Sequence, residues 1–331
     1  MKKIINDPNQ VVQDMIKGLV AAYPNSVKQL QGTTVIARKD APVANKVGLV
    51  SGGGSGHEPA HAGFVGKGLL DAAVAGEVFT SPTPDQVFEA IKAVDSGSGV
   101  FLIIKNYTGD VLNFEMAAEL AEAEGIKVEK VVVNDDVAVE DSSFTTGRRG
   151  IAGTIFVHKI AGAMAEKGGS LDEVKVIAEK VVANVRSMGM AISPCTVPAA
   201  GKPSFELAAD EMEVGMGIHG EPGIERTKIA SADEIAVELT GKVLEDLELK
   251  RNDEIAVMVN GLGSTPEMEL FILNGKVHDI LAEKGINVYK TFVGEYMTSL
   301  EMAGCSVTLL KLDDELKELL DAEALGSAFH S

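Results

Sequence analysis

The chain has 331 residues, 45% of them hydrophobic, and its formal net charge is −19. A chain of this length is too long for one ordinary core, so we expect two domains with a sizeable buried interior. The acidic balance excludes nucleic acid and anionic membranes as partners, because no basic cluster offsets it locally.

Cysteine usage and the N-terminal residues point to one compartment. The two cysteines, Cys195 and Cys305, lie far apart, and neither belongs to a CxxC motif. A disulfide framework or a cysteine-based zinc site is therefore not expected, and a reducing cytoplasm fits. Residues 1–6 lack the apolar stretch of a signal peptide, and no run of about 18 apolar residues is long enough to span a membrane. We expect a cytoplasmic protein.

Strand and helix patterns alternate along the first half of the chain. Residues 100–104 form an unbroken apolar run rich in β-branched side chains, which is typical of a buried parallel strand. The expected helices are 11–23, 111–123, 154–167 and 171–187, and the expected strands are 46–50, 100–104 and 128–133, the last followed by an acidic loop at 134–136.

Residues 188–205 contain three prolines and little periodicity, and we interpret them as a linker between domains. The second half then predicts strands at 213–218, 254–260, 288–292 and 306–310, and helices at 232–247, 267–284 and 313–324. Strands that alternate with helices of this length predict βαβ units. We therefore expect an α/β fold of two α/β domains, residues 1–188 and 189–331, each a largely parallel or mixed sheet covered by helices.

Two short motifs, one in each half, place a histidine among glycines with Glu-Pro close behind. They are SGGGSGHEP at residues 51–59 and IHGEPG at residues 218–223. Small neighbours leave the ring nitrogens of His57 and His219 accessible, which suits chemistry on a small molecule. The alternative is that such a histidine only caps a helix beside a Gly-rich turn, and the residues alone leave both open.

Ligands of open α/β sheets bind beyond the carboxyl ends of the strands, and three polar segments are expected there. The first is the Gly-rich loop around Gly53, where a ligand can approach backbone N–H groups. The second runs from Lys105, a donor for hydroxyl or carbonyl oxygens, to Asp110. Asp110 is either a general base toward a hydroxyl or the N-cap of the following helix, and the two roles are compatible. The third is the loop that holds His219.

Neither Gly-rich loop has the pattern of a nucleotide site, since the chain contains no P-loop and no spaced dinucleotide fingerprint. His57 and His61 are four residues apart, but a zinc site would lack the glutamate of HExxH and a third ligand. We therefore expect no metal and no cofactor on this chain. His158, in an apolar helix, is interpreted as a packed and hydrogen-bonded histidine, and His278 and His330 as surface residues.

Over nearly its whole length the chain resembles the dihydroxyacetone-binding K subunits of dihydroxyacetone kinases. Six long and specific motifs carry the resemblance: GLVSGGGSGHEPAHAGFVGKGLLDAAVAGEVFTSPTPDQ, IIKNYTGDVLNFEMA, TTGRRGIAGTIFVHKIAGA, SPCTVP, GIHGEPG and MTSLEMAGCSVTLL.

The resemblance implies a role for each matching residue. His219 would add through an imidazole nitrogen to the carbonyl of dihydroxyacetone and form a covalent hemiaminal. His57 and Asp110 would act as acid/base groups. Glycerol has the same hydroxyls but no carbonyl, so it would not be captured. The residues that would hold the substrate are Gly53, Gly54, Ser55, Gly56, His57, Ser81, Lys105, Asp110 and His219.

The resemblance also implies partners. Family members that use ATP directly carry a nucleotide-binding domain after the substrate domains, whereas this chain stops at Ser331. A separate L subunit with bound Mg-ATP or Mg-ADP would therefore complete the active site, and a phosphotransferase system fed by phosphoenolpyruvate would recharge its nucleotide. A homodimer is expected. The alternatives are a paralogous co-activator of a transcription regulator, which would need His219 but no catalytic base, and a stand-alone sugar-binding protein.

Overall fold

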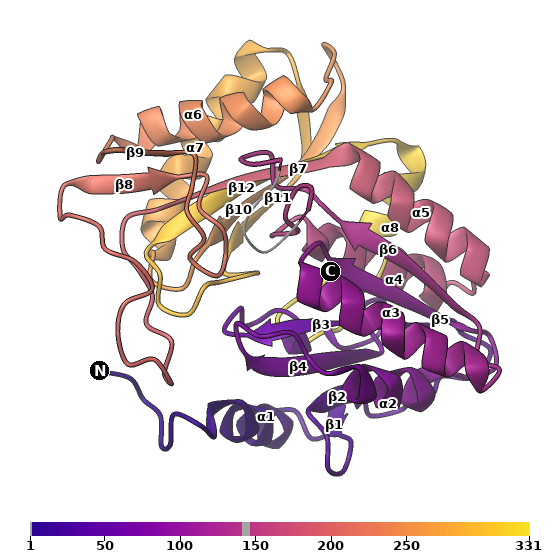
Figure 1. The fold of residues 1–331 in the computed structure, drawn as a ribbon. Coiled ribbons are helices and arrows are strands. Elements are labelled where there is room, and N and C mark those ends of the chain that lie inside the picture. The colour runs from indigo at the N-terminus through magenta and orange to yellow at the C-terminus, as the bar shows by residue number, and fades with distance from the viewer. Residues whose placement is uncertain (1, 141–145) are drawn as a thin grey trace.

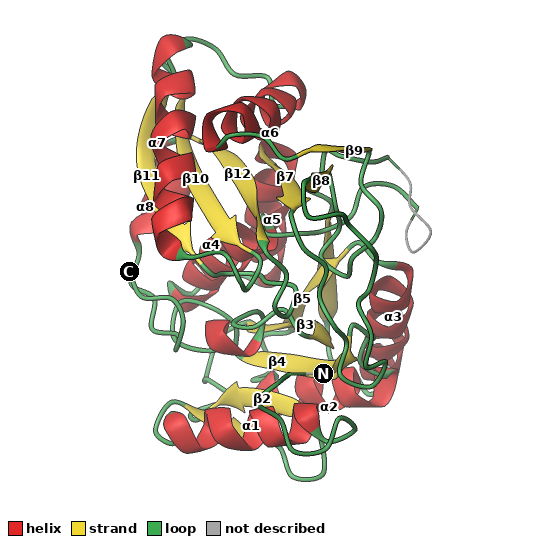
Figure 2. Ribbon diagram, turned by 90° about the vertical axis from the view of Figure 1, so that its left-hand side faces the viewer, coloured by secondary structure: helices red, strands yellow, loops and turns green. Residues whose placement is uncertain are grey.

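A computed structural model of the chain describes residues 2–140 and 146–331. These residues form two six-stranded sheets with helices between and outside them (Figures 1 and 2). Both sheets are mixed and both are covered by helices, which confirms the predicted α/β fold class. The first residue of the motif TTGRRGIAG, Thr145, lies outside the described residues.

The first sheet consists of Val27–Gln29 (β1), Val35–Arg38 (β2), Gly48–Ser55 (β3), Ala72–Val78 (β4), Val100–Lys105 (β5) and Val128–Val133 (β6). Its order is β1–β2–β4–β3–β5–β6. β3 pairs in parallel with β4 and β5, and β5 pairs in parallel with β6. β5 is buried along its whole length, as its apolar run predicted.

The second sheet consists of Val185–Ala191 (β7), Glu211–Val214 (β8), Glu225–Lys228 (β9), Glu254–Gly261 (β10), Asn287–Gly294 (β11) and Gly304–Leu312 (β12). Its order is β11–β10–β12–β7–β8–β9. β10 and β11 run in parallel, whereas β12, β7, β8 and β9 continue the sheet by antiparallel pairing.

The helices form three layers around the two sheets. They are Val11–Ala22 (α1), Pro84–Val94 (α2), Thr108–Ala123 (α3), Thr154–Glu166 (α4), Leu171–Asn184 (α5), Ala232–Asp246 (α6), Glu267–Glu283 (α7) and Asp314–Asp321 (α8). α2 and α3 cover the outer face of the first sheet, and α6 and α7 cover the outer face of the second. α4, α5 and α8 lie between the sheets.

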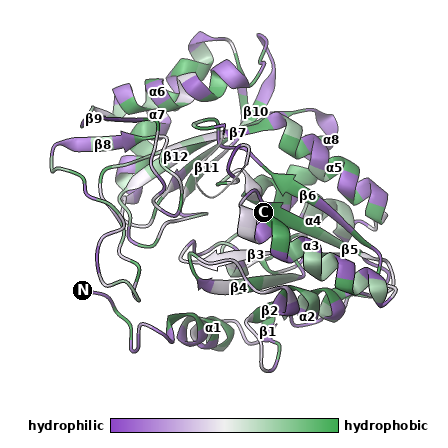
Figure 3. Cartoon of the chain, viewed as in Figure 1, coloured by the Kyte–Doolittle hydropathy of each residue, from purple (hydrophilic) through white to green (hydrophobic). Residues whose placement is uncertain are grey.

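One apolar core joins the two halves of the chain. Phe101 and Ile103 of β5 belong to the same cluster as Ala256 and Met258 of β10, with α4 between them. Figure 3 shows β5 as a largely apolar strand, while α5 and α6 alternate between apolar and polar residues. Among the described residues, no helix combines the length and the apolar character that crossing a bilayer requires.

The predicted linker is corrected by the structure. The helix expected to reach Ser187 ends at Asn184, and β7 occupies residues 185–191. The interpreted linker 188–205 therefore begins inside a strand, and the proposed domain boundary after residue 188 falls within β7. The local sequence Met188-Gly189-Met190-Ala191 has no β-branched residue, so the pairing of β7 with β12 determines this strand and its own propensity does not.

Other predicted elements differ in extent. The strand at 46–50 begins at Gly48 and continues through the Gly-rich segment to Ser55, and the strand at 213–218 is the shorter β8. Sequence patterns gave no signal that we recognised for β1, β2, β4, α2 or β9. Glycines at 52–54 are poor strand formers, but here β4 approaches closely: a Cβ on Gly52 would lie 2.4 Å from the Val74 carbonyl oxygen.

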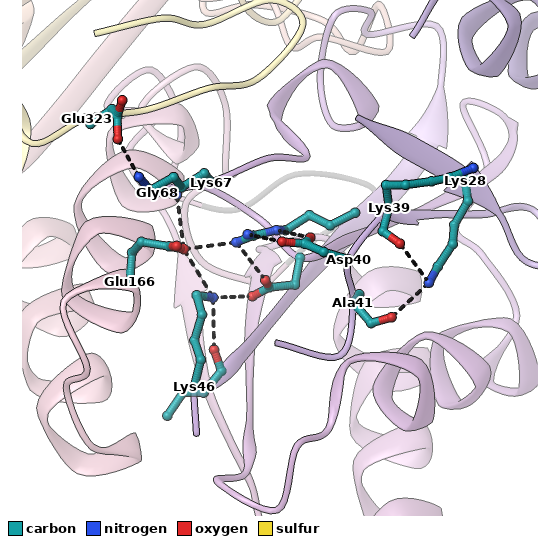
Figure 4. Close-up of polar contacts among 12 residues, drawn as sticks. Lys28, Lys39, Asp40, Ala41, Lys46, Lys67, Gly68, Glu166 and Glu323 are labelled. Atoms are coloured by element: carbon teal, nitrogen blue, oxygen red, sulfur yellow. Dashed lines mark hydrogen bonds and ion pairs between the residues drawn. The ribbon is translucent and has the colours of Figure 1, made fainter. Parts of the chain in front are cut away.

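A buried ionic cluster ties the first sheet to α4. Asp71, which precedes β4, accepts hydrogen bonds from Lys46 Nζ at 2.5 Å and from the Leu49 N–H at 2.8 Å, and it pairs with Arg38 Nη1 at 3.3 Å. Glu166 at the end of α4 joins the cluster through Arg38 at 2.9 Å. Figure 4 shows Lys46, Glu166 and Asp40 within this group of contacts.

We predict that Asp71→Asn destabilises the protein by about 3 kcal/mol or more, because it leaves two buried cations without their shared carboxylate. The free energy of unfolding in urea would measure this. Asp40→Asn is the matched control: Asp40 also pairs with Arg38, but its side chain is 63% exposed, so its loss should cost ~1 kcal/mol or less. Equal effects of the two substitutions would contradict the assignment of the cluster to the core.

Candidate active site

One cavity of about 710 Å³ lies where β5 and α3 of the first half approach the loop between β8 and β9. Four of the predicted site residues line it: Gly54, Ser81, Asp110 and His219. The other residues that line it are Phe79, Tyr107, Thr108, Gly109, Ser204, Phe205, Gly220, Glu221 and Pro222. The cavity is therefore formed by both halves of the chain.

Glu221 fixes the orientation of His219. Its Oε1 lies 2.9 Å from His219 Nδ1, and its Oε2 accepts the backbone N–H of His219 at 2.9 Å. An ionised carboxylate only accepts hydrogen bonds, so the neutral ring carries its proton on Nδ1 and presents an unprotonated Nε2. Burial favours the protonated acid, but the contact with His219 and the nearby Arg149 together outweigh it, and the pKa of Glu221 falls to about 2.

Two glycines make this contact possible. Gly220 adopts φ +80°, a backbone conformation that side chains disfavour, and this turns Glu221 back toward His219. At Gly217 a Cβ would lie 2.1 Å from Glu221 Oε2. The sequence Gly-Ile-His-Gly-Glu therefore encodes the histidine–carboxylate pair locally.

Aromatic rings surround the His219 ring on several sides. The ring centroid of Tyr107 lies 4.6 Å away, that of His57 4.8 Å and that of Phe79 5.2 Å, all in edge-on geometry. Such contacts restrict the ring to one orientation. Nε2 is therefore held at the cavity with little rotational freedom.

His57 is a buried, neutral acceptor. Its Nδ1–H donates to the carbonyl oxygen of Thr298 at 2.8 Å, and a carbonyl oxygen has no proton to give, so Nε2 is the unprotonated nitrogen. Burial, with smaller effects from Lys105 and His219, lowers the pKa of His57 well below its ordinary value. Within the described part of the chain, no group hydrogen-bonds Nε2.

Lys105 and Asp110 converge over Gly53. A Cβ on Gly53 would lie 3.0 Å from Lys105 Nζ and 3.4 Å from Asp110 Oδ2, so glycine is required there. Burial lowers the pKa of Lys105 against the attraction of Asp110, and burial raises the pKa of Asp110 against the attraction of Lys105. In residues 2–140 and 146–331, neither Lys105 Nζ nor Asp110 Oδ1 has a hydrogen-bond partner.

The alternative that Asp110 caps a helix is wrong. α3 begins at Thr108 with Tyr107 as its N-cap residue, and no side chain caps it. Asp110 lies within the first turn and hydrogen-bonds Ser81. Gly109 allows this approach, because a Cβ there would lie 2.7 Å from Ser81 Oγ.

Ser55 and Gly56 do not line the His219 cavity. Ser55 Oγ donates to the Gly76 carbonyl oxygen at 2.7 Å, and the Gly56 N–H donates to Glu58 at 3.0 Å. Both border a different cavity of about 470 Å³, which the N-terminal segment around Ile5 also lines. Their contacts shape the turn that carries His57 and do not reach the His219 cavity.

The remaining histidines form a separate group or lie near the surface. His158 is fully buried and its Nε2 lies 2.9 Å from His61 Nδ1, which confirms that it is packed and hydrogen-bonded. His330 is exposed and His278 partly so. In the described part of the chain, no three histidine, cysteine or acidic side chains gather in a geometry that would hold a metal ion.

Sequence reasoning did not assign a function to three residues of this site. Glu221 orients His219, and Tyr107 and Phe79 pack against it. The spacing of two residues between His219 and Glu221 was a usable signal, since a carboxylate at that distance across a glycine turn can reach the ring. The contacts of Phe79 and Tyr107 depend on tertiary packing and left no local signal.

The chemistry of the cavity fits a small, polar, carbonyl-containing molecule. Its lining offers an imidazole nitrogen at His219 and a carboxylate at Asp110, and the Lys105 ammonium and the His57 ring lie directly beside these two residues. Buried polar atoms without partners are costly, and a bound ligand with hydroxyl groups would satisfy them.

Comparison with known proteins gives one consistent result. A family model described as the Dak1 domain matches residues 17–328. Over 315 residues the chain is 59% identical to a Listeria innocua protein named PTS-dependent dihydroxyacetone kinase 1, dihydroxyacetone-binding subunit DhaK, and the match covers 95% of each chain.

Two solved structures are similar throughout this chain. One, named dihydroxyacetone kinase operon co-activator Dha-DhaQ, has a TM-score of 0.90 at 39% identity and is matched over 98% of both chains. The other is the dihydroxyacetone kinase of C. freundii, with a TM-score of 0.90 at 38% identity. There the match covers 100% of this chain and 60% of the kinase chain.

We predict that His219 in the ligand-free protein is the tautomer with its proton on Nδ1, because Glu221 accepts that proton. ¹⁵N–¹H correlation spectra of the histidine rings would show it. Glu221→Ala should raise the fraction of His219 protonated on Nε2, while the His57 ring, fixed by Thr298, should keep its tautomer. A His219 spectrum that is unchanged in Glu221→Ala would contradict this role.

Proposed function

The chain belongs to the Dak1 domain family, and on that premise we propose that it is the dihydroxyacetone-binding subunit of a dihydroxyacetone kinase. The observation that carries the proposal is the contact of His219 Nδ1 with the Glu221 carboxylate beside a cavity that Asp110 also lines, with Lys105 next to Asp110 and His57 next to His219. Two buried, free cysteines suit a cytoplasmic location, and a homodimer remains a prediction.

Capture would begin with His219 Nε2 attacking the central carbon of dihydroxyacetone. The new N–C bond forms as the carbonyl π electrons move to oxygen, which takes up a proton. Lys105 is the donor available for that oxygen, and its lowered pKa favours proton release. The ring becomes positively charged on forming the bond, and the adjacent Glu221 carboxylate stabilises it.

Phosphorylation would then require a terminal hydroxyl of the captured triose to lose its proton. Asp110 has a carboxylate oxygen without a partner in the described chain, and burial raises its pKa, which makes it a stronger base than an exposed aspartate. His57 Nε2 would accept a hydrogen bond from the new hydroxyl on the central carbon. Ser81, through its hydrogen bond to Asp110, would hold the base in position.

The phosphoryl donor would come from a second subunit. The relative that matches end to end is named a binding subunit, which supports a separate L subunit carrying Mg-ATP or Mg-ADP. Phosphoryl transfer depends on Mg²⁺ and on groups that hold the phosphates. On this chain, Thr108 and Gly109 at the first turn of α3 lie at the cavity, where the incoming subunit would meet the triose.

A second candidate function is co-activation of a transcription regulator. The close similarity to the structure named as an operon co-activator supports this second candidate, because a triose-sensing protein would use the same capture step. Asp110 and its partner Ser81 distinguish the kinase subunit from the co-activator, because a general base is needed only for phosphoryl transfer. The two functions are not exclusive.

We predict that the protein forms one covalent triose adduct per chain and that His219→Ala abolishes it. The mass of the intact wild-type protein, measured after native desalting and without borohydride reduction, would show the adduct. His278→Ala, a substitution of a histidine outside the cavity, is the control and should retain it. Glycerol should give no adduct, since it offers no carbonyl carbon. A His219→Ala protein that still holds the triose covalently would overturn the capture mechanism.

We predict that Asp110→Asn keeps the adduct but lowers phosphorylation by about 10²-fold or more, because the amide retains the shape and loses the base. Product formation from dihydroxyacetone, measured with a nucleotide-loaded L subunit, would test it. Near-wild-type turnover of Asp110→Asn would mean that another group is the base. Absence of any turnover by the wild type with that L subunit would favour the co-activator function.

A further inference from the structure

We propose that Arg149 is a positioning residue for His219, acting through Glu221. The inference deepens the proposed function and rests on it, since it concerns the residue that would capture the triose. It assigns a role to the motif TTGRRGIAG, whose second arginine has no contact with the cavity. Asp136, Arg149, Glu221 and His219 form a buried chain of alternating charge, which we call the orienting chain.

Arg149 is rigidly held on two of its three nitrogens. It is fully buried, its Nε and Nη2 pair with Asp136 Oδ2 at 2.7 Å, and Nη2 also donates to the Gly215 carbonyl oxygen at 2.8 Å. Nη1 has no hydrogen-bond partner among the described residues. A fully buried guanidinium nitrogen without a hydrogen-bond partner costs free energy of folding.

Nη1 lies near Glu221. A Cβ built on Gly217 would lie 2.7 Å from Arg149 Nη1 and 2.1 Å from Glu221 Oε2. Arg149 Nη1 and Glu221 Oε2 therefore lie less than about 5 Å from each other. In a water-poor interior, opposite charges at this separation attract strongly. Gly217 is the residue whose missing side chain leaves the space between them open.

Neighbouring backbone contacts fix where the guanidinium can go. Asp135 accepts the N–H of Ile151 on Oδ1 and that of Gly153 on Oδ2, both at 2.8 Å. The Asp136 N–H donates to the Arg149 carbonyl oxygen at 3.1 Å. The acidic loop after β6 thus anchors the segment before α4. This holds Arg149, which belongs to the first half of the chain, against the loop between β8 and β9 in the second half.

Arg149 acts electrostatically on both carboxylates of the orienting chain. Burial raises the pKa of Asp136 to about 6 against the attraction of Arg149, whereas at Glu221 the effects of His219 and Arg149 outweigh burial and the pKa is about 2. The charged and titratable groups that face Glu221 are His219, Arg149, Lys105 and Tyr107. Burial works against ionisation of Glu221, and after His219 the permanent positive charge of Arg149 also lowers the pKa of Glu221, which keeps this carboxylate able to accept the Nδ1 proton.

A purely structural role is the competing explanation, because the Arg149–Asp136 pair also joins two loops. The two roles differ in what they require. A structural pair can be replaced by neutral hydrogen-bonding side chains that fill the same space. An orienting role requires positive charge beside Glu221, whatever the shape of the side chain that supplies it.

The test uses two variants of the full chain. Arg149→Gln combined with Asp136→Asn removes both charges but keeps hydrogen-bonding groups. We expect a folded protein in which a part of His219 carries its proton on Nε2 and adduct formation slows by about tenfold or more. Arg149→Lys restores a positive charge and should recover both the Nδ1 tautomer and most of the rate. Arg148→Gln, next in sequence and paired with Asp246 at the surface, is the control and should match the wild type.

The ring tautomer is read by ¹⁵N–¹H spectra without ligand, and adduct formation by mass at a fixed time. A double variant with the wild-type tautomer and rate would overturn the proposal, and so would an Arg149→Lys protein no better than the double variant. If the tautomer shifts as expected but the wild type forms no adduct, the orienting chain stands and the capture function fails. The two failures are therefore distinguishable.

Discussion

The hydrogen bond between Glu221 and His219 is the interaction on which the rest of the site depends. It needs an ionised carboxylate in a place that excludes water, where an unpaired charge would be expelled or neutralised. Gly217 and Gly220 supply the space and the turn for it, and His219 is left with one free nitrogen. Lys105 Nζ and Asp110 Oδ1 have no such partner among the described residues, so one half of the site is rigid and the other half is open to a ligand.

This division corresponds to the two halves of the chain. The rigid half, with His219 and Glu221, comes from the loop between β8 and β9, and the open half comes from β5 and α3. The core formed around α4 is shared by both sheets, so the distance between His219 and the polar groups of Lys105 and Asp110 does not depend on a flexible hinge. The proposed triose substrate has only three carbons, and holding it by both its carbonyl and its hydroxyls would need that fixed distance.

Much of this site follows from the sequence, and the remainder depends on packing. The polar segment after a buried apolar strand predicted the positions of Lys105 and Asp110. The glycine motifs predicted accessible ring nitrogens at His57 and His219, which is wrong for His57, because its ring is fully buried. Asp110 is not a helix cap because α3 starts three residues earlier than the apolar pattern suggested. β7 escaped prediction because its strand state comes from β12, and Ser55 was placed in the site by resemblance although its hydroxyl is used by Gly76.

The two similar motifs produce different chemistry through one inserted glycine. In the first motif Glu58 follows His57 directly, its carboxylate accepts the Gly56 N–H, and the His57 ring is oriented by a neutral carbonyl of Thr298. In the second, Gly220 separates His219 from Glu221, and the carboxylate reaches the ring itself. Both histidines therefore present Nε2, but only one has a negative charge behind it. Under the proposed function, a ring that becomes cationic on bond formation would be stabilised by that charge, whereas a ring backed by a carbonyl would remain an acceptor, so the motif spacing supports His219 as the nucleophile.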